Sequence, residues 1–166
     1  MTAPESATGH RARVVRFLLG TDRSRSARVL GALVLAGVAV WGAFALVRPA
    51  TGSALVSLFY VEPLQFVSPL LFVVVVTGWV LACAVVAYVT TGYVPTVAVV
   101  AVPTFAALAE QFVRTNVCCA GAAAAAAPTN LALAAVAAVA HGLVMGAAGY
   151  AVGVGARSVQ ASSDAR

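Results

Sequence analysis

The sequence predicts an all-α fold, an integral membrane bundle of four transmembrane helices. Of its 166 residues, 62% are hydrophobic and 9% are charged, whereas a soluble domain is about half apolar and about a quarter charged. The apolar residues gather in long runs with charged residues at their ends. This composition excludes an ordinary soluble domain and a disordered chain.

Four segments have the length and composition of membrane spans. A helix rises about 1.5 Å per residue, so about 20 residues cross the apolar core of a bilayer. Pro69 and Pro95 fall in the first turns of two segments, where a missing N–H costs little. The predicted spans are 29–47, 68–89, 94–113 and 131–154, within a membrane domain over 29–154.

The connections between the spans carry weaker signals. The loop after the first span has an apolar patch at 55–61 with aromatic residues, which suit the membrane–water interface. We expect a short interfacial helix there, and a re-entrant segment is the alternative. Pro128 is expected to end a short helix in the alanine tract 122–127, and Gly155 is expected to end the last span.

The arginines indicate which way the chain crosses the membrane. The head, residues 1–28, carries six of the ten arginines, and the tail, 155–166, carries two. Only Arg48 and Arg114 fall on the other side of a four-span bundle. Because arginine is enriched on the cytoplasmic side, we expect a plasma-membrane protein with both termini in the cytoplasm.

The basic head is itself a candidate site. Arg11, Arg13 and Arg16 would form a basic surface that lies on an anionic leaflet. The apolar residues among them do not keep to one helical face. The alternative is a solvated tail that only sets the orientation of the chain.

Two ionisable residues within the spans are candidates for a polar site. His141 lies about 15 Å into the last span, near the midplane of the bilayer. Glu110 lies near the outer end of the third span, and Arg114 follows on the same helix face. Ionisable residues at membrane depth are functional-site hypotheses by default. The structural alternatives are a packing contact for His141 and an interfacial ion pair for Glu110.

The last span carries a stripe of small residues. At 100° per residue, its four glycines fall within a narrow band on one helix face. A face without side chains lets another helix approach closely. The stripe is therefore expected to pack within the bundle or, alternatively, against a second copy or a partner. This glycine stripe consists of Gly142, Gly146, Gly149 and Gly153.

The sequence carries no sign of catalysis. It has no Walker loop, zinc-protease motif or nucleophile elbow, and five acidic residues are too few for a typical metal or acid–base centre. Cys118 and Cys119 are neighbours, a poor geometry for a structural disulfide, and Cys83 lies in another span. A disulfide between two chains through Cys118 or Cys119 is the alternative. We expect no enzyme, no cofactor, no metal and no nucleic-acid partner.

These observations favour a small non-catalytic membrane subunit, scaffold or accessory component. Its expected partners are the lipid bilayer and either another membrane protein or a second copy of the chain. The alternative is an oligomeric small-solute or proton-coupled transporter that uses Glu110 and His141. Convergence of those two residues on one cavity would favour transport.

Overall fold

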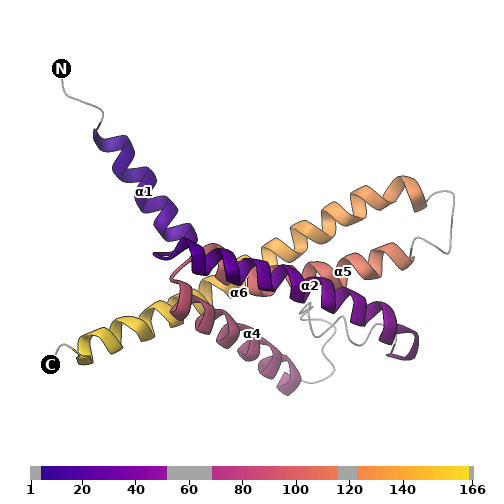
Figure 1. Cartoon of the computed structure of the whole chain (residues 1–166). Helices are drawn as coiled ribbons and strands as arrows, with labels where there is room; N and C mark the ends of the chain where they lie inside the picture. The colour runs from indigo at the N-terminus through magenta and orange to yellow at the C-terminus, as the bar shows by residue number, and fades with distance from the viewer. Residues whose placement is uncertain (1–4, 52–68, 116–122, 165–166) are drawn as a thin grey trace.

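The computed structural model describes residues 5–51, 69–115 and 123–164 (Figure 1). Every regular element within these ranges is an α-helix, which confirms the predicted all-α class. The expected interfacial helix at 55–61 lies outside the described residues, as do Cys118 and Cys119. The helices are α1 (Glu5–Leu19), α2 (Arg23–Thr51), α4 (Pro69–Thr90), α5 (Tyr93–Thr115) and α6 (Ala123–Asp164).

Three helical stretches in the described part of the chain are long and apolar enough to cross a membrane. They are Gly9–Ala43 on α1 and α2, Phe72–Thr90 on α4, and Pro128–Asp164 on α6. The described apolar part of α5, Tyr93–Ala109, is shorter. The structure is therefore compatible with a location in a membrane.

Helix α5 is the element on which the others assemble. It packs against α2, α4 and α6, and α6 also packs against α4. The order of the facing residues shows that α2 and α5 run in one direction and α4 and α6 in the other. Both ends of the described chain therefore lie at the same end of the bundle, on the left in Figure 1. The facing pairs are Thr21 with Thr91, Gly37 with Val102, Ala101 with Gly142, Val97 with Gly146, Cys83 with Gly149, and Ala87 with Gly153.

The glycine stripe lies where α6 meets its two neighbours. Its first two members face α5, and a Cβ on Gly142 would lie 2.9 Å from the carbonyl oxygen of Val97. Its last two members face α4, and a Cβ on Gly149 would lie 2.8 Å from the carbonyl oxygen of Val80. Only a hydrogen fits at such distances, so the helices approach backbone to backbone. The stripe is thus occupied inside the chain.

The core between α4, α5 and α6 is made of small side chains. Cys83 and Val100 are fully buried at its centre. The buried Thr96 hydroxyl donates to the carbonyl of Gly92 at 2.8 Å, and the Cys83 thiol donates to the carbonyl of Thr96 at 3.4 Å. The Thr96 hydroxyl is therefore paired within α5, whereas the Cys83 thiol of α4 is paired with the backbone of α5. Among the described residues, no charged side chain is buried.

Helix α6 begins earlier than the sequence predicts. The expected stop at Pro128 is wrong, because the helix runs without a break from Ala123. Alanine has the highest helix propensity, and a proline this close to the start of a helix removes a single backbone hydrogen bond. The alanine tract and the last span therefore form one helix.

The same helix also ends later than predicted. The expected stop at Gly155 is wrong, since α6 continues to Asp164. The added turns pack against the end of α4, where the Arg157 guanidinium donates to the carbonyl of Tyr88 at 3.1 Å. The Tyr88 hydroxyl in turn donates to the side chain of Gln160. Arg157 satisfies a carbonyl that the end of α4 leaves open, and this contact stabilises the continued helix.

The basic head is helical for most of its length, which the sequence analysis did not predict. Helix α1 ends before Gly20, which has a φ of 81° and donates its N–H to the carbonyl of Arg16 at 2.8 Å. Asp22 caps α2, because its carboxylate accepts the N–H of Arg25 at 3.0 Å. Helix α2 therefore begins at Arg23, six residues before the predicted span.

Gly149→Ala is expected to destabilise the bundle. The new Cβ would collide with the Cβ of Cys83 and the carbonyl oxygen of Val80, and such overpacking costs about 1–3 kcal/mol. The better helix propensity of alanine offsets about 1 kcal/mol of this loss. Gly155→Ala is the control, since its Cβ meets nothing within 4 Å. Equal free energies of unfolding for the two variants in detergent would contradict the close contact.

Candidate functional site

Two tight connections meet at the end of the bundle that carries both chain ends. The connection between α1 and α2 packs against the connection between α4 and α5. A Cβ on Gly20 would overlap the carbonyl oxygen of Thr90, and a Cβ on Gly92 would lie 2.8 Å from the carbonyl carbon of Leu19. The two backbones therefore touch directly. This contact is the elbow junction.

Hydrogen bonds hold the elbow junction together. The N–H of Thr21 donates to the hydroxyl oxygen of Thr91 at 3.2 Å, and the buried Ser26 hydroxyl donates to the carbonyl of Leu19. Thr91 has a φ of 54°, which a β-branched residue adopts only where its surroundings enforce it. The junction is therefore a built contact that sets the direction in which α1 leaves the bundle.

Three aromatic rings pack beside the elbow junction. Phe17 of α1 stacks on Tyr93 of α5 with ring centroids 5.4 Å apart, and Tyr150 of α6 meets both rings edge-on, at 5.7 and 5.5 Å. The hydroxyls of Tyr150 and Tyr93 donate to the carbonyls of Thr91 and Leu143, each at 3.4 Å. Rings with a polar tip are typical of the membrane–water interface. We call these three rings the aromatic cluster.

The predicted basic surface lies at this same end. Its three arginines are exposed on α1, and three further exposed arginines follow at the start of α2. Asp22, which lies among them and outside the predicted spans, is engaged as a helix cap. The backbone N–H of Arg25 and the Ser24 hydroxyl hold the pKa of this carboxyl below its ordinary value. The six exposed arginines are Arg11, Arg13, Arg16, Arg23, Arg25 and Arg28.

The structure does not bring the two ionisable candidates of the spans together. His141 is half-buried on α6, next to Gly142, which faces Val97 and Ala101 of α5. Glu110 lies nine residues beyond Ala101 on α5, about 14 Å further along the helix axis. Its side chain lies outside the described part of the structure. Among the described residues, no group of three side chains could hold a metal ion.

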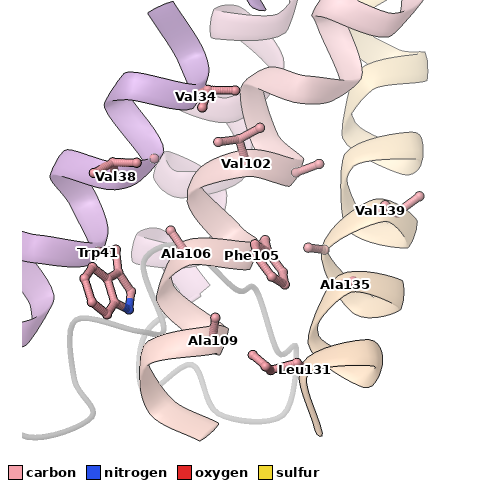
Figure 2. Close-up of a pocket in the computed structure, with 13 residues that line it drawn as sticks. Val34, Val38, Trp41, Val102, Phe105, Ala106, Ala109, Leu131, Ala135 and Val139 are labelled. Atoms are coloured by element: carbon pink, nitrogen blue, oxygen red, sulfur yellow. The ribbon is translucent and has the colours of Figure 1, made fainter. Parts of the chain in front are cut away.

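A groove of about 670 Å³ opens between α2 and α6, with α5 as its floor (Figure 2). The 13 lining residues that the structure describes are apolar, and the indole N–H of Trp41 is the one polar side-chain group among them. Val38 and Trp41 form the α2 wall, Phe105 lies on the floor, and Ala135 and Val139 form the α6 wall. His141 is not part of the lining. We call this feature the interhelical groove.

Neither the elbow junction nor the interhelical groove was predicted from the sequence. A signal for the elbow was present, because Gly20 followed by Asp22 is typical of a helix that ends and another that begins. The groove had no comparable signal. Its walls come from three helices that are remote in sequence, and hydrophobic periodicity does not say which helices become neighbours.

No protein-family model matches this chain, and no curated protein or solved structure is detectably similar to it.

The separation of His141 and Glu110 can be tested by their energetic coupling. Glu110→Gln and His141→Gln are expected to change the free energy of unfolding independently, because effects at sites more than about 7–10 Å apart add to within about 0.5 kcal/mol. Unfolding of the two single variants and the double variant in detergent measures the coupling. A coupling above about 1 kcal/mol would place both residues in one site.

Proposed function

We propose that this chain is a four-span membrane protein that acts as a non-catalytic component and binds a transmembrane helix of a partner protein. The observation that carries the proposal is the interhelical groove, a long apolar depression bounded by three helices of the chain. The proposal has two parts, the topology of the chain and the occupant of the groove.

The geometry of α5 supports a fourth span. The helix has 23 residues, about 35 Å of length, which is enough for an apolar core of about 30 Å. It follows α4 after a two-residue connection, so the two helices run antiparallel side by side. The exposed arginines and the aromatic cluster lie at the end that carries both chain ends. This supports the assignment of that end to the cytoplasmic leaflet.

The lining of the groove supports an apolar helix as its occupant. Among the described lining residues, a polar group in the groove would find only the indole N–H of Trp41 as a side-chain partner, and unpaired polar groups are costly at membrane depth. Six of the 13 lining residues are glycine or alanine, the residue types that let membrane helices approach closely. A helix seated on α5 would contact both the α2 wall and the α6 wall.

The positions of the ionisable residues favour a component over a transporter. A solute or proton path needs polar groups that face one shared cavity. His141 stands outside the groove lining, and the backbone of Glu110 lies at a different depth. The four glycines of α6, which could have formed a contact between chains, are already used against α5 and α4.

Single-cysteine labelling tests the topology. Ala12→Cys and Ser162→Cys, at exposed positions near the two ends, are made without Cys118 and Cys119, and the buried Cys83 adds no background. Both are expected to react with a membrane-impermeant maleimide only after the cells are opened. The native outer cysteines are expected to react in intact cells. A tail labelled from outside while Ala12→Cys stays protected would mean an odd number of spans.

Filling the groove tests the partner. Val139→Trp places an indole in the groove without touching the buried core, since Val139 is 50% exposed. We expect it to reduce recovery of the partner on the order of tenfold, equivalent to about 1.4 kcal/mol of binding free energy. Val144→Trp is the control, because Val144 lies on the same helix, is 68% exposed and does not line the groove. The readout is the mass and composition of the complex extracted from native membranes in mild detergent.

Each outcome of the extraction has a defined meaning. A second protein at fixed stoichiometry in the wild type and the control, but not in Val139→Trp, supports the proposal. Equal recovery from all three chains would exclude the groove as the binding site. A homo-oligomer without a second protein would contradict a partner helix and favour the transporter alternative.

A further inference from the structure

The basic end of the chain is held in a defined position by tertiary contacts. The elbow junction allows no side chain at Gly20, whose Cβ would overlap the carbonyl of Thr90. The ring of Phe17 stacks on Tyr93 of α5 three residues earlier. Helix α1 is therefore attached to the bundle at its C-terminal end by its backbone and by a ring contact, which set the direction of the helix that carries Arg11, Arg13 and Arg16.

The aromatic cluster indicates the level of a bilayer at which these arginines would lie. Tyrosine gathers at the level of the lipid headgroups, and Tyr93 and Tyr150 lie directly beside the elbow junction. Helix α1 also exposes apolar side chains among its arginines, with Val14 41% and Phe17 49% exposed. Exposed apolar side chains next to arginines are typical of helices that lie in a membrane interface.

The charge of α1 and the start of α2 is mainly positive, with six arginines against Glu5 and Asp22. Six exposed arginines occupy α1 and the start of α2, while Asp22, which lies among them, already accepts hydrogen bonds from Arg25 and Ser24. Guanidinium groups bind phosphate oxygens through paired N–H donors and remain charged at every physiological pH. Such a surface is complementary to a layer of phosphates.

We propose that α1 and the start of α2 form a binding surface for the phosphates of anionic lipid headgroups, and that the elbow junction holds this surface at the headgroup level. The inference rests on the membrane placement proposed above but not on the partner helix. It goes beyond orientation, because the arginines would select anionic lipids after the chain has been inserted. Each arginine near an anionic membrane surface increases the binding constant about fivefold.

Hydrogen exchange of α1 in lipid nanodiscs tests the inference. The full chain is placed in nanodiscs of phosphatidylcholine alone or of phosphatidylcholine mixed with phosphatidylglycerol. Exchange of the α1 amides is expected to be slower in the anionic discs, on the order of tenfold. Inorganic phosphate added to the neutral discs is expected not to reproduce this effect, because the surface would bind phosphates arrayed in a bilayer.

Charge variants identify the cause. Substituting Arg11, Arg13 and Arg16 together by glutamine is expected to bring the ratio of exchange rates between the two discs close to one. Substituting the same three residues by lysine keeps the charge and is expected to keep most of the ratio. A wild-type ratio of one, a glutamine variant that retains the ratio, or a lysine variant that loses it would overturn the inference. Slowing of exchange by free phosphate alone would also overturn it.

The Gly20→Ala variant separates the effect of the position of α1 from the effect of its charge. This substitution is expected to lower the ratio without changing any arginine, since its Cβ cannot fit against Thr90. Gly9→Ala is the matched control on α1, because its Cβ meets nothing within 4 Å. Exchange of the α4 and α6 amides in the same experiment reports whether the bundle is folded. If Gly20→Ala unfolds the bundle, the glutamine variant alone tests the inference. A folded Gly20→Ala chain with an unchanged ratio would remove the elbow from the inference.

If the chain does not enter the nanodiscs, the proposed membrane placement is wrong. If the chain enters them and the exchange of α1 does not depend on anionic lipid, only this inference is wrong.

Discussion

The close approach of α6 to its neighbours is the contact on which the rest of the bundle depends. In a bilayer, burying an apolar side chain between helices gains little over contact with lipid, so helices associate where their backbones fit together. Gly142 and Gly149 provide that fit against α5 and α4. Because one stripe serves two neighbours in succession, α6 joins α4 and α5 into a unit and leaves α2 attached through α5. This arrangement leaves the space between α2 and α6 open as the interhelical groove.

A close backbone contact at glycine also forms the elbow junction, where Gly20 and Gly92 let two chain connections touch. Here the close approach sets the direction of a charged helix. Gly20 adopts a left-handed backbone conformation at no steric cost, whereas Thr91 is held in one by its neighbours. The backbone of Thr91 is therefore strained, and the contact that enforces this conformation sets the direction of α1 relative to the bundle.

The two surfaces suit different layers of a membrane. The described lining of the interhelical groove is made of apolar residues and suits hydrocarbon depth, whereas the arginines and tyrosines suit the headgroup level. The core between α4, α5 and α6 is made of small side chains, in which Thr96 pairs within α5 and Cys83 of α4 pairs with the backbone of α5.

The sequence by itself determined the helical class and the approximate place of the long apolar helices. The reason is that the length and hydrophobicity of a segment are local properties, and they decide whether it is more stable in lipid than in water. The sequence also determined that the glycines of α6 share one face, since that follows from the helical period. Only the tertiary structure decided that α5 and α4 cover this face and that α6 continues past Gly155 to Asp164. Each of these depends on how helices remote in sequence fit together. A contact such as that of Arg157 with Tyr88 extends a helix which local signals would have ended.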